Sequence, residues 1–342
     1  MSKIISIGGN EAMVAPGPTT ASRAKAWRPS MGEFRWIWIG TIVLFALSSI
    51  VAPGTVTRGS LLAMLPFAGI LAIVATGQTV VIQQRGLDMS AAGMVSLAGI
   101  VAAVIGYATQ SLLLAVLGSV GVAVVVGLFN GLLAARVNIT PLVATLAVNA
   151  LLIGAIRSIT GNAPISVPPG IQSFAHGSLL GVPHSVWLAI LFVATVALVT
   201  RRTVIGRRFV AVGVNPRAAG AAGVVVLRYQ IGAYAVSATC FAVAGILLAG
   251  FIGNASQTAG NEYLLPAIAA VVVGGTPFTG GRGSVVASGI AALFMAQLAQ
   301  MVLALGAGPA VQLLVTALAI LLATTIRALP RLLQVIAGGA KA

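Results

Sequence analysis

Charged side chains are scarce in this chain of 342 residues, which carries only four acids against nineteen lysines and arginines. Charged residues make up 7% of the sequence, hydrophobic residues make up 59%, and the mean hydropathy is +1.08. A soluble domain has about a quarter charged residues, and a water-soluble fold of this length could not bury so much apolar surface. The composition therefore excludes a soluble globular domain and indicates a protein of the lipid bilayer.

Lysine, which binds the phosphates of ATP in many nucleotide-hydrolysing proteins, is rare in this sequence. It occurs only at Lys3, Lys25 and Lys341, all in the terminal segments. A phosphate-binding loop of the GxxxxGK[ST] type needs a lysine inside the fold, so this chain cannot hydrolyse ATP by that route. The motifs GxSxG, HExxH and CxxC are also missing from the sequence. The sequence therefore argues against an enzyme, and we predict no catalytic residue and no cofactor.

Cysteine and histidine are nearly absent as well. The one cysteine, Cys240, excludes an internal disulfide, and its apolar surroundings predict core packing. His176 and His184 share one polar segment, where solvated loop residues are favoured over a metal pair. We predict no metal site.

Long apolar runs are what the sequence does have. The backbone within a bilayer must satisfy its own hydrogen bonds, and runs of about 20 residues suit helices rather than barrel strands. We expect an all-α polytopic membrane protein with a polar, disordered cytosolic tail over 1–35, a transmembrane domain over 36–326 and a cytosolic C-terminal tail over 327–342. About ten spans are predicted, and the eighth is short enough that a broken or re-entrant segment is the alternative to a full crossing: 36–52, 60–82, 90–107, 111–135, 139–158, 185–200, 229–251, 263–275, 284–304 and 310–326.

The distribution of basic residues gives the orientation. If the N-terminus lies inside, ten spans leave only Arg58 and Arg157 outside. Basic residues favour the cytosolic side in short loops, so we expect both termini in the cytosol. This scatter also argues against a nucleic-acid partner, which would require a basic face or motif despite the net charge of +15.

A charged junction joins the second and third spans. Gly86 can end one helix, and Asp88 or Ser90 can cap the next by accepting N–H bonds from its first turn. Arg85 can neutralise Asp88 locally. A capped, charge-balanced junction is the favoured interpretation, and an acid that carries protons or lines a pathway is the alternative.

Six amides, Gln312 among them, lie in apolar runs, and two interpretations of these amides carry equal weight. They can form hydrogen bonds between helices, or they can line a polar path for a hydroxylated solute. Thr145 with Asn149, and Gln297 with Gln300, each share a helix face by their spacing. The candidate pathway residues are Gln78, Asn130, Asn149, Gln297 and Gln300.

A short internal sequence similarity indicates that the chain has two related halves. Leu65–Pro66 opens a segment that leads to RGLDMS, and Leu265–Pro266 opens one that leads to GGRGSV. Interrupted segments at matching positions in two halves are typical of a transporter built from repeats. We therefore expect a pseudo-repeat.

Four segments in register resemble the permease subunit of ribose/xylose-type ABC sugar importers, to which branched-chain amino acid permeases are distantly related. They are GLDMSAAGMVSLAGIVAA (86–103), FNGLLAARVNITPLVATLAVNALLIGAIRSITGNAPI (129–165), VGVNPRAAGAAGV (212–224) and AIAAVVVGGTPFTGGRGSV (267–285). The resemblance covers about residues 60–326. It implies an inner-membrane permease of a bacterium that moves a monosaccharide or polyol, driven by separate ATPase subunits. It also implies an extracytoplasmic solute-binding protein near 159–184 and 252–262, and a second permease subunit, identical or paralogous.

The resemblance also implies that a short cytosolic helix docks in a groove of the ATPase. The residues that match this segment are Gly213, Asn215, Ala218, Ala219 and Gly223, with Arg217 where the family commonly has an acid. Independently, Asn215 as N-cap and Pro216 at the first position predict a helix there.

The sequence departs from the family in other places too. Arg85 stands at a common glycine, and Leu264 and Pro266 stand where acids are frequent. Three alternatives remain: a proton-coupled carrier that uses Asp88 or Glu262, an ABC permease for a non-sugar small polar solute, and a membrane scaffold that transports nothing.

Overall fold

The computed structural model describes the backbone of residues 34–339 and the side chains of residues 34–325. Most of the predicted tails 1–35 and 327–342 therefore lies outside what is described here, although α13 runs on to Gly339. The elements are α1 (Arg35–Val51), η1 (Pro53–Val56), α2 (Arg58–Gln83), α3 (Ala91–Thr109), α4 (Leu112–Ala135), α5 (Pro141–Thr160), β1 (Ile165–Ser166), α6 (Pro169–His176), β2 (Ser178–Leu179), β3 (Val182–Pro183), α7 (His184–Arg202), α8 (Val204–Val214), α9 (Pro216–Ala221), α10 (Val226–Ile252), β4 (Asn254–Ala255), α11 (Asn261–Val273), α12 (Val285–Ala304) and α13 (Pro309–Gly339).

The all-α membrane architecture is confirmed. Each of the ten predicted spans corresponds to one apolar helix. Within the described residues, seven helices are long and apolar enough to cross a bilayer, and α1, α11 and the first part of α13 are shorter apolar helices. The predicted short eighth segment is α11, and Pro266 lies inside it. A helix of this length rises about 20 Å, which is less than the ~30 Å of a hydrocarbon core.

Several helix ends follow from local sequence. Hydroxyl side chains accept a backbone N–H from the first turn at Thr57 (α2), Ser111 (α4), Thr203 (α8) and Ser284 (α12). At the other end, α10 stops at Gly253, which has a φ of +82°. Glycine adopts this left-handed conformation without steric cost, so the helix terminates there.

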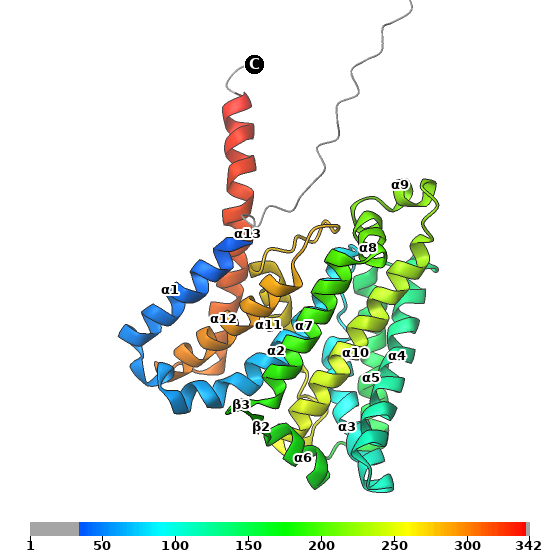
Figure 1. Ribbon diagram of the computed structural model, residues 1–342, viewed down its shortest axis with the longest axis vertical. Coiled ribbons are helices and arrows are strands. Elements are labelled where there is room, and N and C mark those ends of the chain that lie inside the picture. The colour runs from blue at the N-terminus through cyan, green and yellow to red at the C-terminus, as the bar shows by residue number, and fades with distance from the viewer. Residues whose placement is uncertain (1–33, 340–342) are drawn as a thin grey trace, which may run out of the picture.

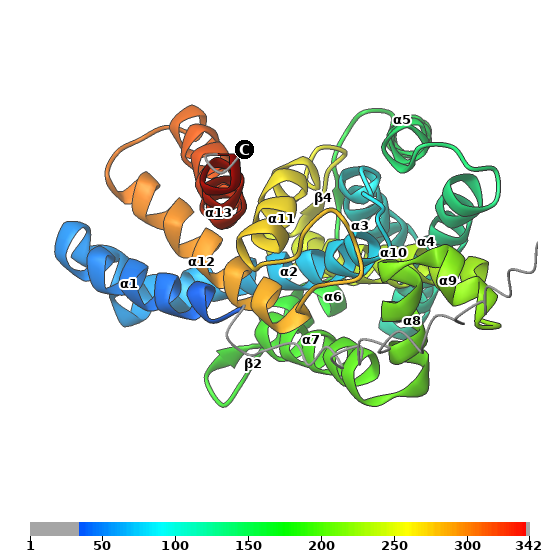
Figure 2. The same ribbon diagram turned by 90° about the horizontal axis from the view of Figure 1, so that it is seen from above.

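Helices α2, α3 and α10 form the centre of the molecule, and α4, α5 and α7 cover it (Figure 2). Small residues allow the central helices to approach closely. A Cβ on Gly245 of α10 would lie 2.0 Å from the carbonyl oxygen of Val95 on α3, and one on Gly127 of α4 would lie 2.5 Å from that of Tyr234. Such backbone contact is the usual basis of helix packing in lipid. Cys240 is fully buried in this core, as predicted.

The two ends of the helix bundle differ in charge. The end that carries α8 and α9 (top of Figure 1), here called the α9 end, receives most of the described arginines. Arg58 and Arg157 lie at the opposite end, where α2 begins and α5 finishes. Two segments that are distant in sequence meet at that opposite end, because β1 pairs antiparallel with β4. The predicted outer loops 159–184 and 252–262 therefore lie side by side.

Candidate coupling site

Loop 84–90, between α2 and α3, folds back among the helices. The Gln78 side chain on α2 donates from Nε2 to the carbonyl oxygen of Asp88 at 2.7 Å. Thr145 on α5 accepts from the backbone N–H of Met89 at 3.0 Å. Asn149, one turn further along α5, accepts from the backbone N–H of Gly93 at 2.8 Å. The predicted shared face of Thr145 and Asn149 is confirmed, and its function in the structure is to hold this loop and the start of α3.

Asp88 is fully buried at the centre of the loop. Its Oδ1 accepts from the backbone N–H of Ser90 at 3.0 Å and from the Ser90 hydroxyl at 2.6 Å. The Ser90 hydroxyl in turn accepts from Asn130 of α4 at 2.8 Å. Asp88 thus stabilises the turn that precedes α3, while Ser90 is the N-cap residue but makes no side-chain cap bond. Neither residue therefore accepts an N–H from the first turn of α3 as we expected, and the N–H of Gly93 in that turn is bound by Asn149 instead.

The predicted local ion pair between Arg85 and Asp88 is wrong. Arg85 has a φ of +64°, and its guanidinium donates from Nε to the carbonyl oxygen of Gly213 at 2.9 Å and from Nη2 to that of Val214. Because the backbone takes the left-handed conformation at Arg85, the side chain leaves the loop on the side of α8. Arg85 therefore joins the α2–α3 loop to the segment that leads into α9.

A second loop joins the same junction. The backbone N–H of Gly281, in the α11–α12 loop 274–284, donates to the carbonyl oxygen of Gln83 at 2.8 Å. The close approach depends on glycine at Gly213, where a Cβ would lie 2.2 Å from the Gln83 oxygen and 2.9 Å from the Gly281 nitrogen. The C-terminal end of α8 and both loops therefore meet at backbone contact. We call this contact, made by Gln83, Arg85, Gly213, Val214 and Gly281, the three-way junction.

The two joined loops occupy equivalent places in the suspected pseudo-repeat. Each follows a helix with an internal proline, Pro66 in α2 and Pro266 in α11, and each precedes a helix rich in small residues. The internal sequence similarity thus corresponds to the same order of elements in both places: a helix with an internal proline, a loop, and a helix rich in small residues.

Helix α9 projects beyond the junction at the end of the molecule (Figure 1). Asn215 caps it by accepting from the N–H of Ala218 at 3.1 Å, and Pro216 occupies its first turn, as predicted. Arg217 and Ala218 are exposed, whereas Ala219 is buried against the protein. Gly223, with a φ of +81°, lies within the short connection 222–225 between α9 and α10. The exposed side of α9 is thus small and basic.

The last two pathway candidates tie α12 to the turn after α1. Gln297 donates from Nε2 to the Thr55 hydroxyl at 3.2 Å, and Gln300 donates to the carbonyl oxygens of Thr55 and Ser60 at 3.4 and 3.3 Å. All five candidate amides thus make hydrogen bonds that join elements of this chain. Contact of any of them with solute stays a prediction.

The remaining polar candidates lie toward the end opposite α9. Glu262 is exposed in the first turn of α11. His184 is hydrogen-bonded through Nδ1 to the carbonyl oxygen of Phe174 at 2.9 Å, and His176 stacks against Phe251. Within the described residues no group of three or more His, Cys, Asp or Glu side chains could hold a metal ion.

Sequence reasoning missed two residues beside Asp88. Tyr234 and Ser237 on α10 are buried, and a Cβ on Gly86 would lie 2.4 Å from the Tyr234 hydroxyl. The Tyr234 and Ser237 hydroxyls and Asp88 Oδ2 make no hydrogen bond of ordinary length and angle with the described residues, although the Ser237 hydroxyl lies beside the Asp88 carboxylate. Hydroxyls in a helix rich in Ala and Gly give no sequence signal for such a cluster, because only the packing of α10 against loop 84–90 brings it together.

The comparisons with known proteins cover most of the chain. The family model described as "Branched-chain amino acid transport system / permease component" matches residues 60–324. The chain is 33% identical over 316 residues to the galactofuranose transporter permease protein YtfT of Escherichia coli, covering 90% of this chain and 92% of that protein.

Two other relatives are similar. The chain is 32% identical to the ribose import permease protein RbsC of Bacillus subtilis, covering 84% of this chain and 90% of that protein. It is 34% identical to the galactose/methyl galactoside import permease protein MglC of Escherichia coli, covering 73% and 80%. No solved structure matches the chain. On the matched span of 60–324 and these identities, the chain belongs to the family of branched-chain amino acid transport system permease components.

Proposed function

We propose that this chain is the membrane subunit of an ABC importer that moves a monosaccharide or polyol into the cell, with ATP hydrolysed on separate subunits. The observation that carries the proposal is the three-way junction. It links α9, the exposed helix at the basic end, to loops 84–90 and 274–284. A subunit that pulls on α9 would therefore act on the ends of α2, α3, α11 and α12 together. Alternating access needs such a two-state element, because a solute pathway requires different affinities in its two states.

The sugar specificity rests on the relatives. Those quoted above are named for galactofuranose, ribose and galactose, and the buried polar groups of this chain are mostly amides and hydroxyls. Neutral hydrogen-bonding groups suit an uncharged polyhydroxylated solute better than an ion.

The orientation follows from charge. With the α9 end in the cytosol, most described arginines face inward, in line with the preference of basic residues for the cytosolic side. A solute-binding protein would then meet the opposite face, where β1 and β4 hold loops 159–184 and 252–262 together. A second copy or a paralogue would complete the pathway in the bacterial inner membrane.

The test is solute uptake by proteoliposomes that contain this chain with a candidate ABC ATPase and a candidate solute-binding protein from the same organism. We expect uptake of one labelled sugar from a panel of ribose, galactose, galactofuranose and a polyol, only with ATP inside and binding protein outside. Leucine in the same panel tests the non-sugar alternative. Uptake that persists without ATP and stops when a protonophore collapses the proton gradient would instead identify a proton-coupled carrier that uses Asp88 or Glu262.

A further inference from the structure

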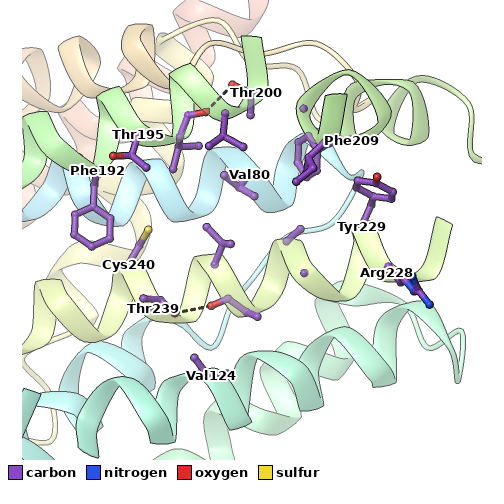
Figure 3. Close-up of a pocket in the computed structure, with 18 of the residues that line it drawn as sticks. Val80, Val124, Phe192, Thr195, Thr200, Phe209, Arg228, Tyr229, Thr239 and Cys240 are labelled. Atoms are coloured by element: carbon purple, nitrogen blue, oxygen red, sulfur yellow. Dashed lines mark hydrogen bonds between the residues drawn. The ribbon is translucent and has the colours of Figure 1, made fainter. Parts of the chain in front are cut away.

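An apolar groove opens between α7 and α10, with α2 and α4 contributing to its walls (Figure 3). Its volume is about 880 Å³, and its walls include Leu191, Phe192 and Val196 on α7 and Gly232, Val236 and Cys240 on α10. We call it the α7–α10 groove. From Arg228 to Cys240 it follows α10 for about 18 Å at 1.5 Å per residue. This length is close to the depth of one leaflet, which is half of a ~30 Å hydrocarbon core.

The walls of the α7–α10 groove offer little to a sugar. The Thr200 hydroxyl donates to the carbonyl oxygen of Val196, and the Thr239 hydroxyl donates to that of Ala235, so these two donors are used within their own helices. The hydroxyls of Thr195 and Tyr229 and the Arg228 guanidinium are the other polar side-chain groups of the walls. A polar ligand would need several free, converging hydrogen-bond groups. An unbranched hydrocarbon chain needs none.

The mouth of the groove is basic. Arg228 lies at the end nearest α8 and is exposed, and its guanidinium makes no hydrogen bond or ion pair within the described part of the chain. Tyr229, the next residue of α10, also lines the groove. Arginine and tyrosine at the end of a spanning helix are typical of the lipid headgroup level.

From this arrangement we infer that the α7–α10 groove binds one acyl chain of an anionic phospholipid whose phosphate contacts Arg228. A second copy of this chain is a poor alternative occupant of the groove, because it offers no suitable acidic side chain to pair with Arg228. The chain has only four acids; of the two that the structure describes, Asp88 is buried and Glu262 lies toward the opposite end. The site does not depend on the transport proposal, but its assignment to the inner leaflet rests on the proposed orientation.

The experiment measures lipid binding by the purified full-length chain, without ATPase, binding protein or solute, so its outcome is separate from that of the transport test. Native mass spectrometry in detergent gives the occupancy with added phosphatidylglycerol and, separately, phosphatidylethanolamine. Arg228→Gln removes the charge. Gly232→Leu fills the groove, since a Cβ there meets nothing within 4 Å. The matched controls are Arg136→Gln, an exposed arginine at the same end, and Gly154→Leu, an open helical glycine on α5.

We expect Arg228→Gln to weaken phosphatidylglycerol binding about tenfold, the loss of one charge-assisted contact, with little effect on phosphatidylethanolamine. Gly232→Leu should lower the occupancy of both lipids, and the two controls should match the parent. Thermal unfolding verifies that all four variants are folded. Unchanged phosphatidylglycerol binding in both test variants would overturn the inference. So would displacement of the lipid by glycerol 3-phosphate, which indicates a headgroup site alone, or loss of a dimer mass in Gly232→Leu with lipid retained, which indicates a second copy in the groove.

Discussion

Arg85 is the residue on which transmission from α9 most directly depends. Its guanidinium makes two hydrogen bonds to the carbonyl oxygens of Gly213 and Val214, one partly buried and one exposed. A hydrogen bond from a charged donor contributes about 1.5–3 kcal/mol when buried and less when solvent screens it. We take about 1.5 kcal/mol for the partly buried bond to Gly213 and a fraction of that for the exposed bond to Val214. The two bonds together then contribute roughly 2 kcal/mol to holding the end of α8 against the loop. The ratio of attached to detached α8 ends would then fall about thirtyfold on removal of both.

Arg85→Asn is the sharpest perturbation because the backbone there has a φ of +64°. Asparagine tolerates the left-handed region better than most residues, but its side chain is too short to reach α8. We expect faster hydrogen exchange at the α8 end and in α9, by up to about thirtyfold, because exchange reports local opening. In proteoliposomes with the partner subunits, solute imported per ATP hydrolysed should fall, while ATP hydrolysis continues.

Two control variants distinguish the loss of the Arg85 hydrogen bonds from the loss of a positive charge. Arg85→Lys keeps the charge and loses the forked geometry, so its exchange and coupling should lie between parent and Arg85→Asn. Arg136→Gln removes an exposed guanidinium that makes no hydrogen bond with the described residues, and it should leave both measurements unchanged. If Arg85→Asn imports as much solute per ATP as the parent and protects α9 equally, transmission through Arg85 is refuted.

Three further outcomes are expected. Gly213→Ala should lower the free energy of unfolding by about 1–3 kcal/mol because its Cβ meets backbone atoms that cannot turn away, whereas Gly220→Ala, with its nearest atom at 3.8 Å, should not; thermal unfolding measures both. Asn149→Ala should cost about 1 kcal/mol through loss of the bond to Gly93, and a change in solute KM without a change in stability would instead place Asn149 in the pathway. Replacing 215–219 by a Gly/Ser stretch should abolish uptake with normal membrane insertion, and uptake with normal coupling would contradict docking through α9.

Sequence reasoning predicted what depends on local pattern. The spans follow from runs of apolar residues, and the α9 cap follows from Asn215 and Pro216 at adjacent positions. The spacing of Gln297 and Gln300 placed both on one face, and both reach the segment 55–60. In each case the determining residues lie within one turn or one helix of each other.

The three-way junction could not be predicted in this way. Arg85 and Asp88 are close in sequence and opposite in charge, so a local pair was the natural expectation. The left-handed backbone at Arg85 directs its side chain toward carbonyl groups that are 128 and 129 positions away. Backbone carbonyls carry no residue-specific signal, and neither does the N–H of Gly281 that binds Gln83. Glycine at Gly213 marks a close approach without identifying the partner.

The three-way junction also explains how so short a helix could move the protein. A helix of six residues is not stable by itself, so α9 holds its place through the end of α8, which is fastened by Arg85 and packed at Gly213. Since Gly281 binds Gln83 across the same contact, a displacement of α9 reaches both loops at once. Each loop leads into a helix, α3 in one case and α12 in the other, and these belong to different halves of the suspected pseudo-repeat. A pull at one exposed helix would thus be shared between the halves, which is the requirement for rocking one half against the other.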